Sequence, residues 1–183
     1  MADEKKFVDP LTFNDNDTPI IILCDDLRGF TGWAIKSHTK GNYNHACIIH
    51  RPGRIVSQGF TSFKAHDISV YLTPGMMLKF WRIKDLTMLE KVSIRSAISS
   101  RLALPWWRRT YDFLGVVGGQ LTGMKWIQSP FQAFCSEQVM DDYISVIPRA
   151  KAVEIYKPSP SELNAAFTNH PELMECLGYY LGD

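Results

Sequence analysis

A cysteine at the start of a helix is the residue of this chain best suited to nucleophilic chemistry. Cys135 follows an irregular aromatic run in which Pro130 blocks helix, and Val139 and Tyr143 recur after it at helical spacing. Unpaired backbone N–H groups and the positive end of the helix dipole favour a thiolate at such a position. The sequence therefore predicts a cysteine nucleophile able to attack a carbonyl carbon.

A cysteine nucleophile needs a base, and every histidine of the chain is far from Cys135 in sequence. His45 lies between apolar neighbours in a predicted strand, so its side chain points into the core or into a cleft. A strand histidine or a free cysteine, taken alone, is ordinarily a core residue. Their combination indicates a Cys–His pair. The other histidines are expected to be solvated: His38, His50, His66 and His170.

Composition favours one globular domain. The chain has 183 residues, 45% of them hydrophobic, which is enough to bury one core. Residues 1–18 are polar and turn-rich, so we expect a flexible N-terminal lead-in, with a single domain over 19–183. The 20 basic and 19 acidic residues are spread along the chain, so no nucleic acid partner is expected.

No apolar run approaches the ~20 residues of a membrane span, and the charged N-terminus is unlike a secretory signal. We therefore expect a soluble, cytoplasmic protein without an integral membrane segment, which would need lysis or another route to act elsewhere. The cysteines show no short paired spacing, and Cys24 and Cys47 are expected to be small buried thiols. We accordingly predict no metal and no cofactor.

Apolar runs precede helical patterns along the chain. Strands are predicted over 20–24, 43–50, 54–59 and 76–83, of which the second and third form an antiparallel hairpin. This order of strands followed by helices predicts an α+β domain with a small antiparallel sheet.

Helical periodicity is longest from Thr87 to Leu104, before Pro105. The side chains predicted to form its buried face are Leu89, Val92, Ile98 and Leu102. Shorter helical segments are expected over 30–37 and 111–117, from position 135 onward, and as one turn at 161–163.

Three sequence blocks resemble the circularly permuted branch of the papain-like cysteine peptidases and amidases. This is the NlpC-type superfamily, which also includes relatives of lecithin retinol acyltransferase. The stretch 41–49 resembles its aromatic-Ser-His strand, Tyr111-Asp112 followed by Gly115 is the second block, and 134–139 is close to its Cys-Ser-Glu-Leu-Val helix start. With a Pro-Ser run at 158–163, the likeness covers roughly residues 18–165. The cysteine follows the histidine here, as permutation implies.

The resemblance implies a permuted papain-like fold, a small antiparallel sheet or half-barrel packed against helices, and a thiol hydrolase. Cys135 would form an acyl-enzyme and His45 would be its base. The third polar group would be Gln58, with Ser57 as second choice, although Gln58 adds no negative charge to stabilise an imidazolium. The residues assigned to substrate binding are Tyr111, Phe134 and Trp107.

Substrates implied by the family are peptidoglycan peptide amides, other small amides and lipid acyl groups. An apolar wall that includes Phe134 would suit an acyl chain, while Trp107 belongs either to a substrate-contacting lip or to a connector packed on the core. The alternative function is a binding or structural module that keeps the fold with weak or no catalysis, a possibility raised by Gln58. The sequence leaves the oligomeric state open.

Overall fold

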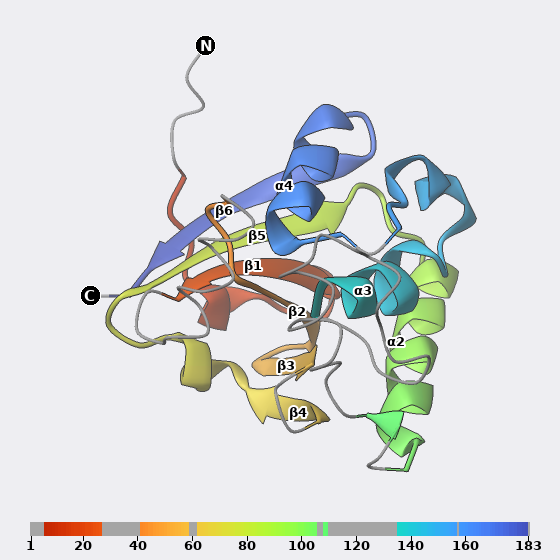
Figure 1. Ribbon diagram of the computed structural model, residues 1–183, viewed down its shortest axis with the longest axis horizontal. Coiled ribbons are helices and arrows are strands. Elements are labelled where there is room, and N and C mark those ends of the chain that lie inside the picture. Colours follow the sequence, from red (N-terminus) through yellow and green to blue (C-terminus); the bar gives the residue numbers. More distant parts are fainter. Residues whose placement is uncertain are drawn as a thin grey trace, which may run out of the picture.

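A six-stranded antiparallel sheet forms the centre of the molecule (Figure 1). The computed structural model describes residues 6–26, 41–58, 62–105, 108–109, 135–156 and 158–182. The strand order is β4-β3-β2-β1-β5-β6, and every neighbouring pair is antiparallel. The strands are β1 (Ile20–Asp26), β2 (His45–Arg51), β3 (Arg54–Gln58), β4 (Phe63–Asp67), β5 (Met76–Ile83) and β6 (Met174–Leu181).

Helical segments join and cover the strands, which confirms the predicted α+β class. Two of them begin with a capping box, in which Thr87 and Ser159 each exchange hydrogen bonds with a glutamate three residues later. The helices are α2 (Met88–Ala103), α3 (Cys135–Val139) and α4 (Pro160–Asn169). The shorter turns are η1 (Pro10–Thr12), η2 (Ile68–Tyr71), the π-helical η5 (Met140–Ile144) and η6 (Pro148–Val153).

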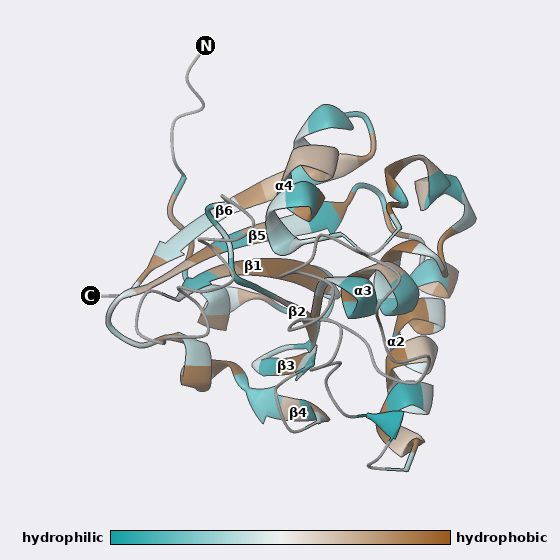
Figure 2. Cartoon of the chain, in the orientation of Figure 1, coloured by the Kyte–Doolittle hydropathy of each residue, from teal (hydrophilic) through white to brown (hydrophobic). Residues whose placement is uncertain are grey.

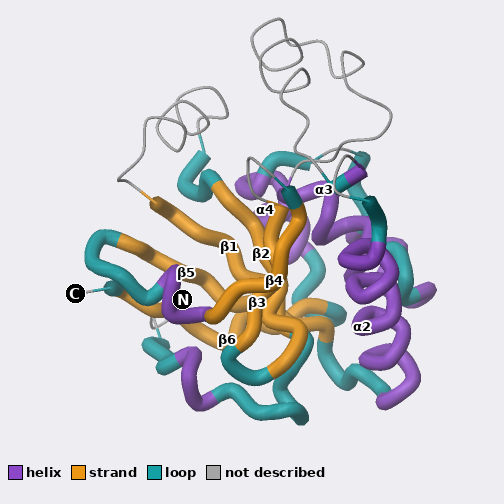
Figure 3. Tube along the Cα trace, turned by 90° about the horizontal axis from the view of Figure 1, so that it is seen from below, coloured by secondary structure: helices purple, strands orange, loops and turns teal. Residues whose placement is uncertain are grey.

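The sheet buries both of its faces. Because side chains alternate along a strand, Ile21 and Leu23 of β1 lie on the side covered by α2, α3 and α4, which we call the helix face. Ile20 and Ile22 lie on the opposite face, which η2 and the N-terminal segment cover. This two-sided burial explains the continuous apolar runs of the central strands, visible in the colouring of β1 in Figure 2. Figure 3 shows α2 and α3 together on one side of the sheet.

Residues 6–18, part of the predicted flexible lead-in, contact the sheet: residues 6–8 lie along its edge strand β6, and Phe13 packs on Phe80. The backbone N–H of Val8 donates to the carbonyl of Tyr179 and that of Tyr179 donates to the carbonyl of Lys6, both at 2.8 Å. A Cβ at Gly178 would lie 2.5 Å from that Lys6 oxygen, and Gly178 has a φ of 141°, so this close approach requires glycine.

The predicted strands are confirmed, including the hairpin of β2 and β3, but two edge strands were not predicted. β4 has the sequence Phe-Lys-Ala-His-Asp and faces solvent along much of its length. Because most of its residues are polar or small, it lacks the apolar run from which the confirmed strands were predicted. It carries His66, which was expected in a loop. β6 contains a glycine and has few fully buried side chains, so it gave no clear apolar run.

The predicted long helix is confirmed as α2, and its predicted buried face is correct for Ile98 and for the partly buried Leu102 but wrong for Leu89 and Val92. Ile94 and Ile98 are its buried residues, whereas Leu89 and Val92 are 76% and 52% exposed. The periodicity of an apolar pattern identified a helix but only some of the side chains that the rest of the fold covers.

Further expectations for helices had different outcomes. α4 is longer than the single turn expected at 161–163. The segments 30–37 and 111–117 lie outside the described residues. Across the part of the chain that the structure describes, we find no helix with the length and hydrophobicity needed to traverse a bilayer.

Candidate functional site

Cys135 is the first residue of α3 and lies against the start of β2. Its side chain belongs to the core of the helix face, together with Ala46 and Ile48, and is only 3% exposed. The hydroxyl of the next residue, Ser136, donates to the carbonyl of Pro158 and so ties the beginning of α3 to the segment before α4. Packing and this bond together hold the thiol at the sheet.

The electrostatic surroundings of the Cys135 sulfur act in two directions. Burial raises the pKa of the thiol to about 12. The nearby backbone N–H groups of Ala46, Ser136 and Cys135 itself favour the thiolate and oppose that increase. Desolvation outweighs them, so the resting form is the neutral thiol. The expectation of a thiolate stabilised by the helix start is therefore wrong for this structure.

His45 is the first residue of β2 and forms a polar chain with η2. Its Nε2 lies 2.9 Å from the hydroxyl oxygen of Tyr71, and the two rings stack with centroids 5.8 Å apart. The Tyr71 hydroxyl donates to Oγ of Ser57 at 3.4 Å. The direction of the bond between His45 and Tyr71 depends on the tautomer of the imidazole, and the tautomer that carries the proton on Nε2 leaves Nδ1 as its basic nitrogen.

The structure brings Cys135 and His45 into one region but does not pair them. Cys135 packs on the helix face, whereas Tyr71, the partner of His45, packs against the opposite face with Cys47 and Ile49. Among the described residues there is no hydrogen bond between the thiol and the imidazole. Burial raises the pKa of Tyr71, and the thiols of Cys47, Cys24 and Cys135 contribute to this increase. Cys135 is therefore near enough to Tyr71 to influence it, although the two side chains pack on different faces of the sheet.

Gln58 and Ser57, the two predicted candidates for the third polar group, lie in different surroundings. The Nε2 of Gln58 donates to the carbonyl oxygen of Arg109 at 2.8 Å, and its side chain is buried. Ser57 is the residue that joins the chain of hydrogen bonds from His45, through Tyr71. The alternation of β3 puts these neighbours on opposite faces of the sheet.

Tyr71 is the site residue that the sequence did not indicate. It reaches His45 because η2 begins after β4, where the carboxylate of Asp67 caps it by accepting from the N–H of Ser69. Asp and Ser two residues apart predict such a cap, but no local pattern predicts which strand the following tyrosine contacts. Three residues assigned to substrate binding lie outside the described residues: Tyr111, Phe134 and Trp107.

Other expected features of this region are partly confirmed. Cys24 and Cys47 are fully buried, with their sulfur atoms 3.9 Å apart, as predicted for small core residues. His50 is not the solvated residue expected, because its ring is partly buried and burial lowers its pKa to about 4.

No protein-family model matches the chain, and comparison with curated proteins gives no match either.

Proposed function

We propose that this chain is a thiol hydrolase of the permuted papain-like fold, which cleaves an amide or ester bond through an acyl-enzyme on Cys135. The observation that supports this best is the position of the Cys135 sulfur between β2 and α3, where backbone N–H groups of both elements lower the pKa of the thiol against the effect of burial. Groups that donate to a sulfur also stabilise the negative charge that develops on it, or beside it, during attack on a carbonyl.

The raised pKa of Cys135 determines how the first step would proceed. A thiol with a pKa near 12 is protonated at neutral pH, so its proton must leave as the sulfur attacks. In the proposed step Nδ1 of His45 takes this proton, while Nε2–H stays bonded to Tyr71. The S–C bond forms and the carbonyl π electrons move to oxygen. The carbonyl then re-forms, the C–N or C–O bond breaks, and the imidazolium protonates the departing amine or alcohol. In the second half His45 takes a proton from an attacking water molecule, the C–S bond breaks to release the carboxylic acid, and the imidazolium returns a proton to the sulfur.

The position of His45 bears on whether its imidazole can reach the sulfur. The pair Cys24 and His45 is the last in the β1–β2 ladder, and pairing with β3 begins only at Cys47. His45 is thus the first residue of β2, next to Ala46, whose backbone N–H lies near the Cys135 sulfur. In the proposal the proton passes around this strand end, directly or through one water molecule.

The test is covalent capture of the acyl-enzyme. Intact-mass spectrometry after incubation with p-nitrophenyl acetate should show one acetyl adduct on the wild type and none on Cys135→Ala or His45→Ala. Cys176→Ala is the matched control, because that cysteine is exposed on β6 and its loss should leave the adduct unchanged. An adduct that persists in Cys135→Ala would contradict the proposal.

A second candidate function is a binding module of the same fold without catalysis. The burial of Cys135 and the contact of His45 with the opposite face favour it. A folded wild type that forms no adduct and hydrolyses none of the three substrate classes, peptidoglycan peptide amides, small amides and lipid acyl esters, would support this candidate. Thermal unfolding would establish that the protein tested is folded.

A further inference from the structure

Lys79 of β5 is a buried cation whose described partners are two aromatic rings. Its side chain is 8% exposed, and its ammonium lies 4.5 Å from the ring centroid of Trp81 and 5.4 Å from that of Tyr179. Within the described ranges, no hydrogen bond or ion pair reaches this ammonium. Ring faces attract a cation, but they do not replace the hydrogen bonds that a buried ammonium gives up on leaving water. Its three N–H donors therefore remain available to a ligand.

Strand register places Lys79 on the same face of the sheet as the candidate nucleophile. Ala46 pairs with Leu23, Leu23 with Lys79, and Lys79 with Tyr179, so these four residues form one row across the sheet. Residues directly opposite each other share a face, and strands are spaced about 4.8 Å apart. Lys79 therefore lies about 10 Å from Ala46, whose backbone N–H lies near the Cys135 sulfur.

The walls around Lys79 are held by α4. The indole N–H of Trp81 donates to Oδ1 of Asn164 at 3.3 Å, and its ring packs edge-on against Phe167. The backbone N–H of Tyr43, two residues before His45, donates to Oγ of Ser161. Fixed side chains around a cation provide a preorganised site rather than a chance surface charge.

Two tyrosines of this region carry hydroxyl donors: Tyr179, whose ring contacts the ammonium, and Tyr43, which lies near Tyr179. Burial, with the nearby Tyr179 as the next cause, raises the pKa of Tyr43, so its hydroxyl keeps its proton and can donate. Asp25 is also close enough to contribute to that increase, and no ion pair between described residues joins it to Lys79. One ammonium with neutral donors matches a carboxylate, which carries one negative charge and accepts several hydrogen bonds.

We propose that Lys79, with Tyr43 and Tyr179, forms a subsite that recognises a carboxylate of the substrate, about 10 Å from the bond cleaved at Cys135. This inference rests on the proposed hydrolase function and narrows its substrates. It selects amides or esters that carry a carboxylate, such as acidic peptides, over neutral lipid acyl chains.

The main test compares two series of synthetic esters. One series consists of p-nitrophenyl half-esters of straight-chain dicarboxylic acids from glutaric to suberic, and the other of neutral p-nitrophenyl alkanoates of equal chain length. We expect the wild type to favour the best half-ester by roughly 10- to 100-fold in kcat/KM. Lys79→Met should abolish this preference by lowering kcat/KM for the half-esters to that variant's own value for the neutral esters of equal length. Lys64→Met, an exposed lysine of β4, is the matched control and should retain the preference.

A binding measurement separates this inference from the hydrolase proposal. Calorimetric titration of Cys135→Ala with monomethyl suberate should show binding that is lost in the Cys135→Ala, Lys79→Met double variant. Binding of monomethyl suberate to Cys135→Ala, with no ester hydrolysis by the wild type, would support the carboxylate subsite and contradict the hydrolase proposal. Hydrolysis of both ester series at equal rates, without binding of monomethyl suberate, would support the hydrolase proposal and contradict the subsite.

Thermal unfolding distinguishes recognition from a purely structural role of Lys79. Methionine is of similar length and removes a buried charge that lacks polar partners, so Lys79→Met should unfold at the same temperature as the wild type or higher. A substantial loss of stability would mean that Lys79 serves to hold Trp81 and Tyr179 in place, and would overturn the subsite.

Discussion

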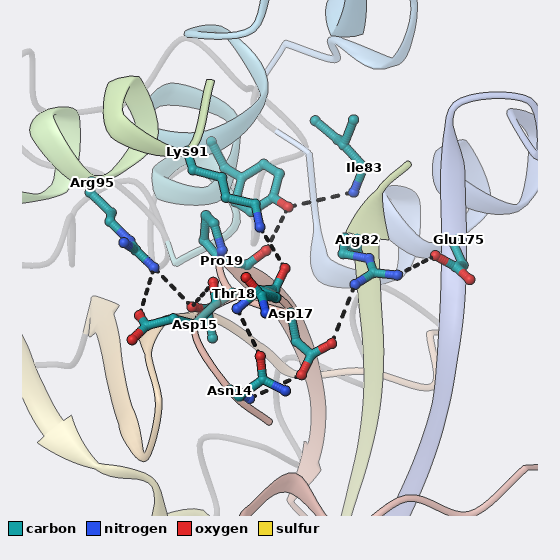
Figure 4. A network of polar contacts seen from close by, with 12 residues as sticks. Asn14, Asp15, Asp17, Thr18, Pro19, Arg82, Ile83, Lys91, Arg95 and Glu175 are labelled. Carbon is teal, nitrogen blue, oxygen red and sulfur yellow. Dashed lines mark hydrogen bonds and ion pairs between the residues drawn. The ribbon is translucent and has the colours of Figure 1, made fainter. Parts of the chain in front are cut away.

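The two ends of the β1–β2 pair are both rich in polar residues, but their chemistry differs. At the end near Ile20, Arg95 donates to Asp15 and to the hydroxyl of Thr18, both at 3.1 Å, and Arg82 lies between two carboxylates (Figure 4). At the end near His45, hydrogen bonds join the imidazole to the hydroxyls of Tyr71 and Ser57, while the Cys135 thiol packs on the other face of the sheet.

This difference separates a structural role from a chemical one. The ion pairs near Ile20 are partly exposed to solvent, so forming them costs little desolvation free energy. They connect the N-terminal segment to α2 and β5. The polar groups near His45 include the buried Ser57, and hydrogen bonds are stronger where water is excluded. In this molecule ion pairs stabilise the scaffold near Ile20, whereas hydrogen-bonded polar side chains form the candidate site near His45.

The largest expected effect tests the burial of the thiol. Native protein treated with iodoacetamide at neutral pH should be alkylated at exposed Cys176 at least ~100-fold faster than at Cys135, whose pKa burial raises to about 12. Peptide mass spectrometry measures both rates. Labelling of Cys135 first at mildly acidic pH would instead restore the thiolate that the helix start predicted.

The next effect tests the polar chain at the His45 end. Tyr71→Phe keeps the ring that stacks on His45 but removes the oxygen bonded to Nε2, so the imidazole loses its orientation. We expect kcat for ester hydrolysis to fall about 10- to 100-fold, with a changed pH profile. Tyr180→Phe is the control, because Tyr180 packs on the same core. Equal activity of both variants would remove Tyr71 from the site.

At the opposite end, the expected effect is on stability alone. The buried hydroxyl of Tyr143 donates to the carbonyl of Pro19 at 2.8 Å, directly before β1. Tyr143→Phe leaves that carbonyl unpaired and should lower the free energy of unfolding by about 1–3 kcal/mol, measured by urea denaturation. Hydrolysis by the folded variant should remain at the wild-type rate. A loss of activity in folded protein would show that the two ends are coupled.

The smallest effect concerns His50, which lies near Arg95 at the same end. Burial lowers its folded pKa to about 4, below the ordinary value of about 6.5. As pH falls from 6.5 to 4 the unfolded chain takes up this proton first, so the stability that His50 contributes above pH 6.5 is lost across that range. Melting temperatures should therefore decline less steeply below pH 6.5 in His50→Gln. An identical slope in both proteins would contradict this account.

Local sequence patterns determined much of the framework. Continuous apolar runs identified the central strands because those strands are buried on both faces, and the apolar repeat from Thr87 to Leu104, before Pro105, identified α2. The pattern after Cys135 identified the start of α3. Each of these signals reflects conformational preferences or burial of neighbouring residues, which a single segment can encode.

Only the tertiary structure decided the state and partners of the site residues. The helix start favours a thiolate at Cys135, but packing against β2 buries the sulfur and reverses the balance. Tyr71 meets His45 because a distant turn folds over the opposite face, and Lys79 shares a face with Cys135 because of strand register. Desolvation and contact between distant segments depend on where the whole chain places its parts, and no local pattern of residue types contains that information.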